Sequence, residues 1–518
     1  TFSLLLKACQ KDAAFADAHC MPNVLTMPNP WNKETQGTIQ DMLHVYFQGE
    51  ATNSQQEEII NCFDLMQDAD SLGSIMKFNI SDGTRLLIKQ ATDYWCIQPI
   101  VPEEVRTQIA AFKLILALTE KYHALIANPP YMGRGHMTNV LSNYLDKNYP
   151  NAKSDLFSTF MDMMLERTIE NGKTAFITME SWMFLSSFEK FRKNIIDNYH
   201  IASLGHFGWY IIGIAFGTVM TVIDKCKSKG RKGVYSYLTI DDVDRETNVP
   251  FVYPKKDNGR FAIVEQKNFE KIPGCPIGYW VSEKIFEIFA RNRAVSAVCR
   301  PAEGLATADT ARFLRLWFEV GCNRIGFGYE NAASAALSLK KWFPHDKGGT
   351  FRRWYGNQDY IINWENDGFE VKNNKGAVIR NPKLYFTPSV SWSNICSKAI
   401  SARYFGKGFI YDVSAFSAFA PNEEILPYIL GLTNSAVVGY IKPLLNPTFH
   451  FTPGDFGKLP YKEEIVNNTD IEEKVQQNIA ISKSDWDAHE TSWDFQRNEL
   501  LAIDAKTYED NVRYEEEK

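Results

Sequence analysis

Apolar positions recur three and four residues apart over most of the first 120 or so residues, a spacing that is typical of helices. The start of the chain, Thr1–Ala8, already has this pattern. One helix is predicted to begin at Pro102-Glu103-Glu104, because proline suits a first helical turn. Its apolar positions are Ile109, Phe112, Leu116 and Leu118. This part of the chain is therefore expected to be mostly helical.

The pattern then changes to short apolar runs separated by helical stretches. The expected elements are, in order, a buried strand at Ala124–Ala127, a helix from Lys153 to Thr168, a turn at Asn171–Lys173, a strand at Thr174–Thr178, a further helix and a strand at Val219–Ile223. Strands that alternate with helices indicate an α/β sheet.

The second half of the chain has a different organisation. Residues 226 to 260 are polar and contain several glycines, which suits a domain boundary. From about 275 to 460 the segments are short, aromatic and interrupted by Gly, Asn and Pro, which predicts a mixed α+β domain. Residues 424–445 are expected to form one helix packed on that domain. The tail from residue 468 is acidic and helical in pattern, with Trp486 and Trp493 as anchors. The expected domains are 1–245, 246–460 and 461–518.

Composition limits the class of protein. A chain of 518 residues with 45% hydrophobic residues is expected to fold as two or three domains with real cores. No apolar run approaches the roughly 18 residues of a membrane span. The nine cysteines include no Cys-x-x-Cys pair, which favours reduced thiols and a cytoplasmic protein. The nine histidines have no ligand spacing, so no structural metal is expected.

The net charge of −6 argues mildly against a nucleic-acid partner, but charge is unevenly distributed. Residues 301–410 contain 15 Lys and Arg against 9 Asp and Glu, whereas residues 461–518 contain 7 against 16. The basic segment also contains the aromatics Trp317, Phe343, Phe351, Trp354, Tyr355, Trp364 and Trp392. Basic residues interleaved with aromatics suit a nucleic-acid face. The alternative is a solvated basic surface over an aromatic core.

The tetrapeptide Asn128-Pro129-Pro130-Tyr131 is the clearest candidate for chemistry. It follows the predicted strand, where an α/β sheet presents ligands. The Asn128 side-chain oxygen and the Pro129 carbonyl can each accept one N–H of an exocyclic amine, which favours a pyramidal nitrogen with a directed lone pair. The prolines fix the backbone that aims these acceptors, and Tyr131 offers a flat face to a base taken out of its stack. The alternative interpretation is a simple turn that ends a strand.

With its flanks, this motif resembles the N6-adenine DNA methyltransferases of the amino-methyltransferase superfamily. Asp155-Leu156-Phe157 is similar to the segment that follows the catalytic motif, and Phe216 is similar to the late aromatic that packs on the flipped base. The resemblance implies that Asn128, Pro129, Pro130 and Tyr131 are catalytic and that Tyr131 and Phe216 stack on the target base.

Further motifs resemble the methyltransferases of the BREX phage-exclusion systems (PglX type) and their type IIG-like relatives. They are Ile272–Trp280, Lys347–Gly349, Arg352–Asn357, Val390–Ser393, Ser401–Phe405 and Asn446–Phe449. The fold class that this resemblance implies is α/β: a partial Rossmann-like class I methyltransferase sheet, then a mixed α+β DNA target-recognition domain and a helical acidic tail. The implied DNA contacts are Arg134, Arg352, Arg353, Trp354, Tyr355 and Arg403. His136 is a further candidate beside Arg134, with a flexible Gly loop as the alternative.

The resemblance implies S-adenosylmethionine as cofactor, double-stranded DNA and other BREX components as partners, and no membrane. However, the Gly-rich strand turn that holds the methionine part is not visible, since the four glycines before Asn128 lie far apart. Thr1–Ala8 resembles the helix after the ribose-binding strand, so the chain is expected to be a carboxyl-terminal piece, inactive alone. Its cofactor-binding residues are unknown. Asp68–Ser74 either borders the adenine pocket or is a solvated loop.

Three functions remain open from the sequence. The first is site-specific N6-adenine methylation of duplex DNA in phage defence. The second is methylation of a protein glutamine, since such enzymes can share the Asn-Pro-Pro-Tyr motif, although they are compact and need no long aromatic, basic domain. The third is a non-enzymatic DNA-recognition module, because the cofactor motif is absent.

Overall fold

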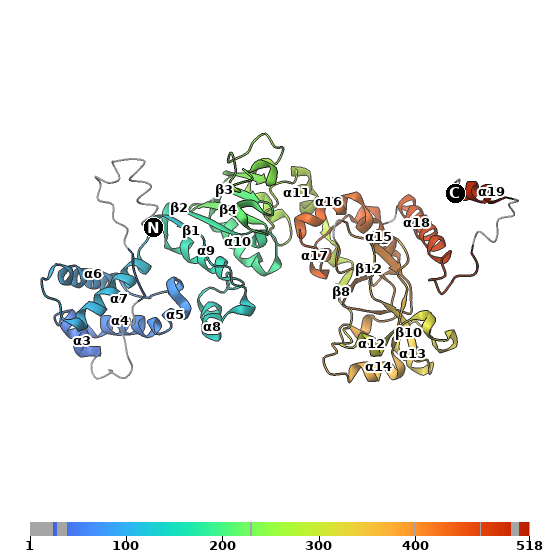
Figure 1. The fold of residues 1–518 in the computed structure, drawn as a ribbon, viewed down its shortest axis with the longest axis horizontal. Helices are drawn as coiled ribbons and strands as arrows, with labels where there is room; N and C mark the ends of the chain where they lie inside the picture. Colours follow the sequence, from blue (N-terminus) through green and yellow to red (C-terminus); the bar gives the residue numbers. More distant parts are fainter. Residues whose placement is uncertain are drawn as a thin grey trace. The chain divides into compact units, whose positions relative to one another are not determined.

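The computed structural model describes residues 24–27, 39–227, 230–396, 399–466, 468–498 and 507–516, so the predicted helical start Thr1–Ala8 lies outside the described residues. The chain divides into two compact units (Figure 1). Unit 1 comprises Thr1–Trp182 and Ser187–Lys267, and unit 2 comprises Met183–Ser186 and Asn268–Lys518.

Helices dominate the first part of unit 1, as predicted. They are α3 (Ile39–Tyr46), α4 (Asn53–Met66), α5 (Ala69–Leu72), α6 (Asp82–Ile97) and α7 (Glu103–Thr119). Thr52 caps α4 through a reciprocal capping box and Ser81 caps α6, which satisfies N–H groups at each helix start. Pro102 occupies the N-cap of α7 and not its first turn. The rings of Tyr46 and Phe112 lie 4.5 Å apart in the core between these helices.

A six-stranded sheet forms the rest of unit 1, in the order β1-β2-β4-β3-β5-β6. Its strands are β1 (Tyr122–Ala127), β2 (Thr168–Met179), β3 (His200–Phe207), β4 (Thr218–Asp224), β5 (Lys232–Leu238) and β6 (Phe261–Glu265). β1 pairs parallel with β2, and β4 lies antiparallel between β2 and β3. Between strands run α8 (Asn139–Asn148), α9 (Leu156–Arg167), which packs on β2, and α10 (Glu189–Asn198), which packs on β3.

The sheet extends further than the sequence indicated. β2 begins at Thr168, and the predicted turn is an irregularity inside the strand: Asn171 has a φ of 64°, and the register with β1 shifts between the pairs Tyr122–Thr168 and Ala124–Lys173. The strand β3 was not predicted. The predicted domain boundary at residue 245 is wrong, because β6 pairs antiparallel with β5 and keeps the segment up to Lys267 in unit 1.

Unit 2 is built on two four-stranded sheets, which fits the expected mixed α+β class. Their orders are β14-β10-β11-β9 and β13-β12-β15-β8, and a small pair joins β16 to β7. The strands are β7 (Arg293–Ala294), β8 (Arg300–Ala302), β9 (Leu314–Leu316), β10 (Trp342–Asp346), β11 (Tyr360–Asn363), β12 (Ser389–Ser393), β13 (Ala402–Phe405), β14 (Ile410–Tyr411), β15 (Ala415–Phe419) and β16 (Pro460–Tyr461). The helices are α11 (Glu283–Arg291), α12 (Thr310–Phe313), α13 (Ala332–Leu337), α14 (Glu365–Lys372), α15 (Leu426–Asn434), α16 (Ala436–Leu445), α17 (Pro453–Gly457), α18 (Thr469–Asp487) and α19 (Tyr508–Glu516). Aromatic side chains, among them Phe343, Trp364 and Phe386, fill the main core of this unit.

Two predictions for the end of the chain need correction. The expected single helix at 424–445 is a bent pair, α15 and α16, because Ser435 adopts an extended conformation and caps α16 by accepting from the Val438 N–H. No single helix among the described residues is long and apolar enough to cross a membrane. The bent pair reaches that length and composition only when its two helices are taken together. The tail from 461 is not a separate domain, since Trp486 is buried and Trp493 packs against Phe409 of unit 2.

Candidate functional site

The tetrapeptide Asn128–Tyr131 lies at the carboxyl end of β1, as predicted. Ala127, the residue before it, is in register with Phe176 of β2, so the sheet fixes where the motif begins. Pro129 is buried, whereas Asn128 is exposed. Within the described ranges no residue forms a hydrogen bond with the Asn128 side chain, so its amide oxygen remains available to accept an N–H.

Asp155 connects the motif to α9. Its carboxylate accepts from the Met132 N–H at 3.0 Å and caps α9 by accepting from the Phe157 N–H at 3.2 Å. The Leu156 N–H donates to the Met132 carbonyl at 3.0 Å. Burial raises the pKa of Asp155, while these N–H donors act in the opposite direction. The sequence indicated Asp155 only through its resemblance to a family motif, and the structure shows that it positions the loop.

Three aromatic rings from different segments meet beside the motif. The ring of Tyr131 lies 6.0 Å from that of Phe157 and 6.0 Å from that of Phe216, edge-on in both cases. The Tyr131 hydroxyl donates to the Ile177 carbonyl of β2 at 3.3 Å. Burial, with the nearby Asp155, raises the pKa of Tyr131, so the phenol stays neutral. The structure thus brings Tyr131 and Phe216 together, and their role in stacking on a base stays a prediction.

Glu180 and His206 form a polar pair at the same edge, which the sequence did not reveal. His206 Nε2 and Glu180 Oε2 are 2.6 Å apart. The Glu180 N–H donates to the carbonyl of Gly217, which follows Phe216. A Cβ at Gly217 would lie 2.2 Å from the Glu180 carboxyl group, so a larger residue there would displace this carboxylate from its contact with His206. The Glu180 backbone therefore holds the segment that follows Phe216.

Arg134 and His136 lie on an exposed short 3₁₀ helix just past the motif. Arg134 forms an ion pair with Asp146, which also pairs with Lys153 at 2.8 Å. The predicted phosphate contact of Arg134 would therefore have to compete with Asp146.

The predicted DNA contacts in unit 2 differ in their surroundings. Arg352 pairs with Asp485 of α18 at 2.8 Å and lies 5.1 Å from the Trp486 ring. Arg353 forms no ion pair in the described part of the chain and packs over Phe351, with 5.5 Å from the guanidinium to the ring centroid.

The two aromatics that follow are held within the unit. The Trp354 N–H donates to the Ala402 carbonyl at 2.8 Å, which ties this segment to β13. The Tyr355 ring lies 5.0 Å from the Lys483 ammonium of α18, and its hydroxyl donates to Gln358. For both residues a DNA contact stays a prediction.

Arg403 does not fit its predicted role. Its side chain is 0% exposed, and its guanidinium donates to the Arg352 carbonyl at 3.2 Å and to Ser393 Oγ at 3.4 Å. Burial lowers the pKa of Arg403, and the attraction of the buried Asp346 opposes that shift. A direct DNA contact is therefore excluded in this structure, and Arg403 supports the packing of β13.

The described residues do not include the Gly-rich strand turn that the implied cofactor would need. Only helices precede β1 in the range 39–121, so no described strand ends there in a Gly-rich turn. Asp68–Ser74 is largely the short helix α5, and its Ser74 carbonyl accepts from Arg167 of α9 at 3.0 Å. Among the residues with a described placement, no group of His, Cys, Asp or Glu has the arrangement of a metal site.

The chain has relatives among known proteins. Residues 2–212 match the family model of the Eco57I restriction-modification methylase. The chain is 36% identical over 396 residues to the adenine-specific methyltransferase BrxX of Escherichia coli O9:H4 (strain HS), covering 74% of this chain and 31% of that protein. It is also 36% identical over 399 residues to the adenine-specific methyltransferase PglX of Lacticaseibacillus casei (strain Zhang), covering 74% of this chain and 33% of that protein.

Among solved structures, one of the Type IIL restriction-modification enzyme MmeI in complex with DNA aligns with a TM-score of 0.46 and 13% identity, covering 89% of this chain and 69% of that chain. The chain spans about a third of the length of the curated relatives that it matches. The resemblance expected from the motifs is nevertheless confirmed: this chain is a homologue of the adenine-specific methyltransferases BrxX and PglX.

Proposed function

We propose that this chain is part of a site-specific DNA methyltransferase that transfers a methyl group to the N6 amine of adenine. The observation that carries the proposal is the free amide of Asn128, held at the carboxyl end of β1 beside the rings of Tyr131 and Phe216. An acceptor for an amine next to aromatic faces suits a base that has left its stack.

Each residue has a defined part in this proposal. The Asn128 oxygen and the Pro129 carbonyl accept the two N–H groups of the amine and direct its lone pair outward. Tyr131 stacks on the base, a contact worth roughly 1–3 kcal/mol in nucleic-acid binding. Asp155 holds the loop, so that these groups are in place before the base arrives. The amine can lose its proton after attack, so no strong general base is required.

The methyl donor that we propose is S-adenosylmethionine, which supplies an electrophilic methyl group when bound. The order β1-β2-β4-β3, with β4 antiparallel, is consistent with part of a class I methyltransferase sheet. β1 is an edge strand among the described residues, and its Ile126 is 83% exposed. Among the residues that the structure describes, none is assigned to bind the donor.

Unit 2 is proposed as the target-recognition domain. Its segment 301–410 contains six more Lys and Arg than Asp and Glu, in a chain of net charge −6. Cationic side chains bind phosphates and fix the register on duplex DNA, while base contacts give specificity. The similarity to the adenine-specific methyltransferases BrxX and PglX supports a function in BREX phage defence. The partners that we propose are double-stranded DNA and other BREX components.

The test uses the full-length protein expressed with its partners in cells that lack adenine methylation. Mass spectrometry of digested DNA should detect N6-methyladenine. Asn128→Ala should abolish the product while the protein still binds DNA, because the lost acceptor matters most as the nitrogen pyramidalises. Asn61→Ala, an exposed asparagine on α4, is the matched control and should retain activity. Methylation of a protein glutamine in place of DNA, or normal methylation by Asn128→Ala, would overturn the proposal.

A further inference from the structure

The loop Gly208–Gly217, which joins β3 to β4, carries two exposed aromatic side chains besides Phe216. Trp209 and Tyr210 are 57% and 62% exposed, and their rings lie 6.4 Å apart. Soluble proteins rarely expose a tryptophan and a tyrosine side by side without a partner for them. The loop thus has one aromatic against the motif tyrosine and two facing outward.

The backbone of this loop is held in an unusual conformation. Tyr210 has a φ of 65° and Ile212 a φ of 53°, a region that is costly for a β-branched residue. Ile211 between them is fully buried in a small core with Phe207 and Leu238. The Tyr210 N–H donates to the Ile214 carbonyl at 2.8 Å. Buried Ile211 and partly buried Ile212 therefore anchor the loop in this core, while Trp209 and Tyr210 remain exposed.

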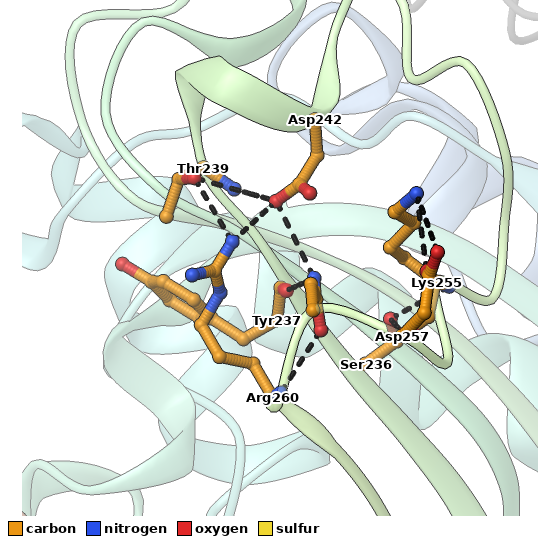
Figure 2. A network of polar contacts seen from close by, with 8 residues as sticks. Ser236, Tyr237, Thr239, Asp242, Lys255, Asp257 and Arg260 are labelled. Carbon is orange, nitrogen blue, oxygen red and sulfur yellow. Dashed lines mark hydrogen bonds and ion pairs between the residues drawn. The ribbon is translucent and has the colours of Figure 1, made fainter.

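A second loop supports the first. The Ile212 N–H donates to the Asn248 carbonyl at 2.9 Å, which joins the loop to the segment between Asp242 and β6. That segment exposes Val249, Phe251 and Val252. Its base is braced by the polar network of Figure 2, in which Asp242 pairs with Arg260 at 2.6 Å and accepts from the Thr239 N–H at 2.9 Å. The two loops thus present exposed apolar side chains in the same unit as the motif.

We propose that Trp209, with Tyr210 beside it, inserts into duplex DNA next to the extruded adenine and stacks on the bases that extrusion leaves unpaired. This inference rests on the proposed function. The partner of these exposed aromatics is duplex DNA, because the same loop carries Phe216. The Phe216 ring lies 6.0 Å from that of Tyr131, which is proposed to contact the target base. Inserted aromatic or apolar side chains replace lost base stacking when a duplex is opened. Trp209 would thereby lower the free energy of extruding the base, without touching the reacting atoms.

The experiment exploits the cost of extrusion. The full-length protein is assayed on two duplexes that carry its mapped methylation site, one with the target adenine paired to thymine and one with the adenine mispaired. Because a mispaired base leaves the stack more easily, the mispaired duplex needs the inserted side chain less. Trp209→Ala should lower kcat/KM on the matched duplex by roughly tenfold or more and come close to wild type on the mispaired one. Trp209→Phe should restore most of the loss.

Tyr94→Ala is the matched control, because Tyr94 is also exposed in unit 1 and packs edge-on against a neighbouring tryptophan, Trp95. It should behave as wild type on both duplexes. An equal loss for Trp209→Ala on matched and mispaired DNA would overturn the insertion and indicate a packing role. An unchanged rate on both would overturn it as well. Asn128→Ala separates the two proposals, since it should be inactive on both duplexes if the proposed function holds.

Discussion

Replacing Asp155 with alanine removes a single carboxylate that serves two segments, the motif loop and α9. Loss of an N-cap typically costs about 1 kcal/mol. The Met132 N–H, now without its acceptor in a partly buried position, adds about 1–3 kcal/mol. The local free energy of opening should therefore fall by about 2–4 kcal/mol. Asp155→Asn keeps an oxygen acceptor at the same place. Because burial disfavours the charged form of Asp155, the loss of the charge should cost little stability.

Hydrogen exchange measured by mass spectrometry gives the local readout, since a chain of two units need not unfold in one step. Peptides that contain Met132 and Phe157 should exchange roughly 30- to 1,000-fold faster in Asp155→Ala, because each 1.4 kcal/mol is a factor of ten. Peptides of unit 2 should not change, and Asp155→Asn should resemble the wild type. If the Met132 peptide exchanges at its normal rate in Asp155→Ala, Asp155 does not hold the motif loop.

Three further predictions follow from buried and charged groups. Burial and the neighbouring Glu166 raise the pKa of Asp162 to about 6, so unit 1 loses stability as the pH rises from about 4 to 6. Chemical denaturation should show that Asp162→Asn raises the free energy of unfolding by up to about 3 kcal/mol at pH 7. This gain should vanish towards pH 4, where Asp162 is also uncharged. Arg403→Met should destabilise unit 2 by about 1–3 kcal/mol in thermal unfolding, because it leaves the Arg352 carbonyl and Ser393 Oγ without a buried donor, and a change in DNA affinity with unaltered stability would contradict the buried role. Arg353→Ala should weaken DNA binding and reduce the salt dependence by about one unit of log–log slope, whereas Arg352→Ala should mainly loosen α18; equal effects of both on the salt slope would show that Asp485 does not occupy Arg352.

Local signals predicted the parts of the site that are close in sequence. The apolar run before Asn128 gave β1, and the pattern from Lys153 to Thr168 gave α9, since both depend on neighbouring residues. The contact between Tyr131 and Phe216 joins residues far apart in the chain, and only a family resemblance pointed to it. The pair of Glu180 and His206 had no such signal, because neither residue belongs to a recognised motif.

Other errors have a common physical cause. The polar, Gly-bearing composition of residues 226–260 predicts a domain boundary, but the same composition serves the turns that flank β5, which pairs with β6 in unit 1. Arg403 lies in an Arg-Tyr-Phe sequence that looks like a surface recognition segment. Its burial depends on Ser393 and on the Arg352 carbonyl, which come from other parts of unit 2. Composition describes residue types, whereas these outcomes depend on which strands pair.

The path of the chain between its units has an evolutionary consequence. The chain crosses from one unit to the other at Trp182, at Ser186 and at Lys267. Met183 and Phe184 in this short segment of unit 2 are buried, and the Ile277 N–H donates to the Met183 carbonyl at 2.8 Å. Recombination at residue 267 alone would therefore import a foreign unit 2 without its own Met183–Ser186 segment. A shuffled gene yields an intact unit 2 only when residues 183–186 are inherited from the same parent.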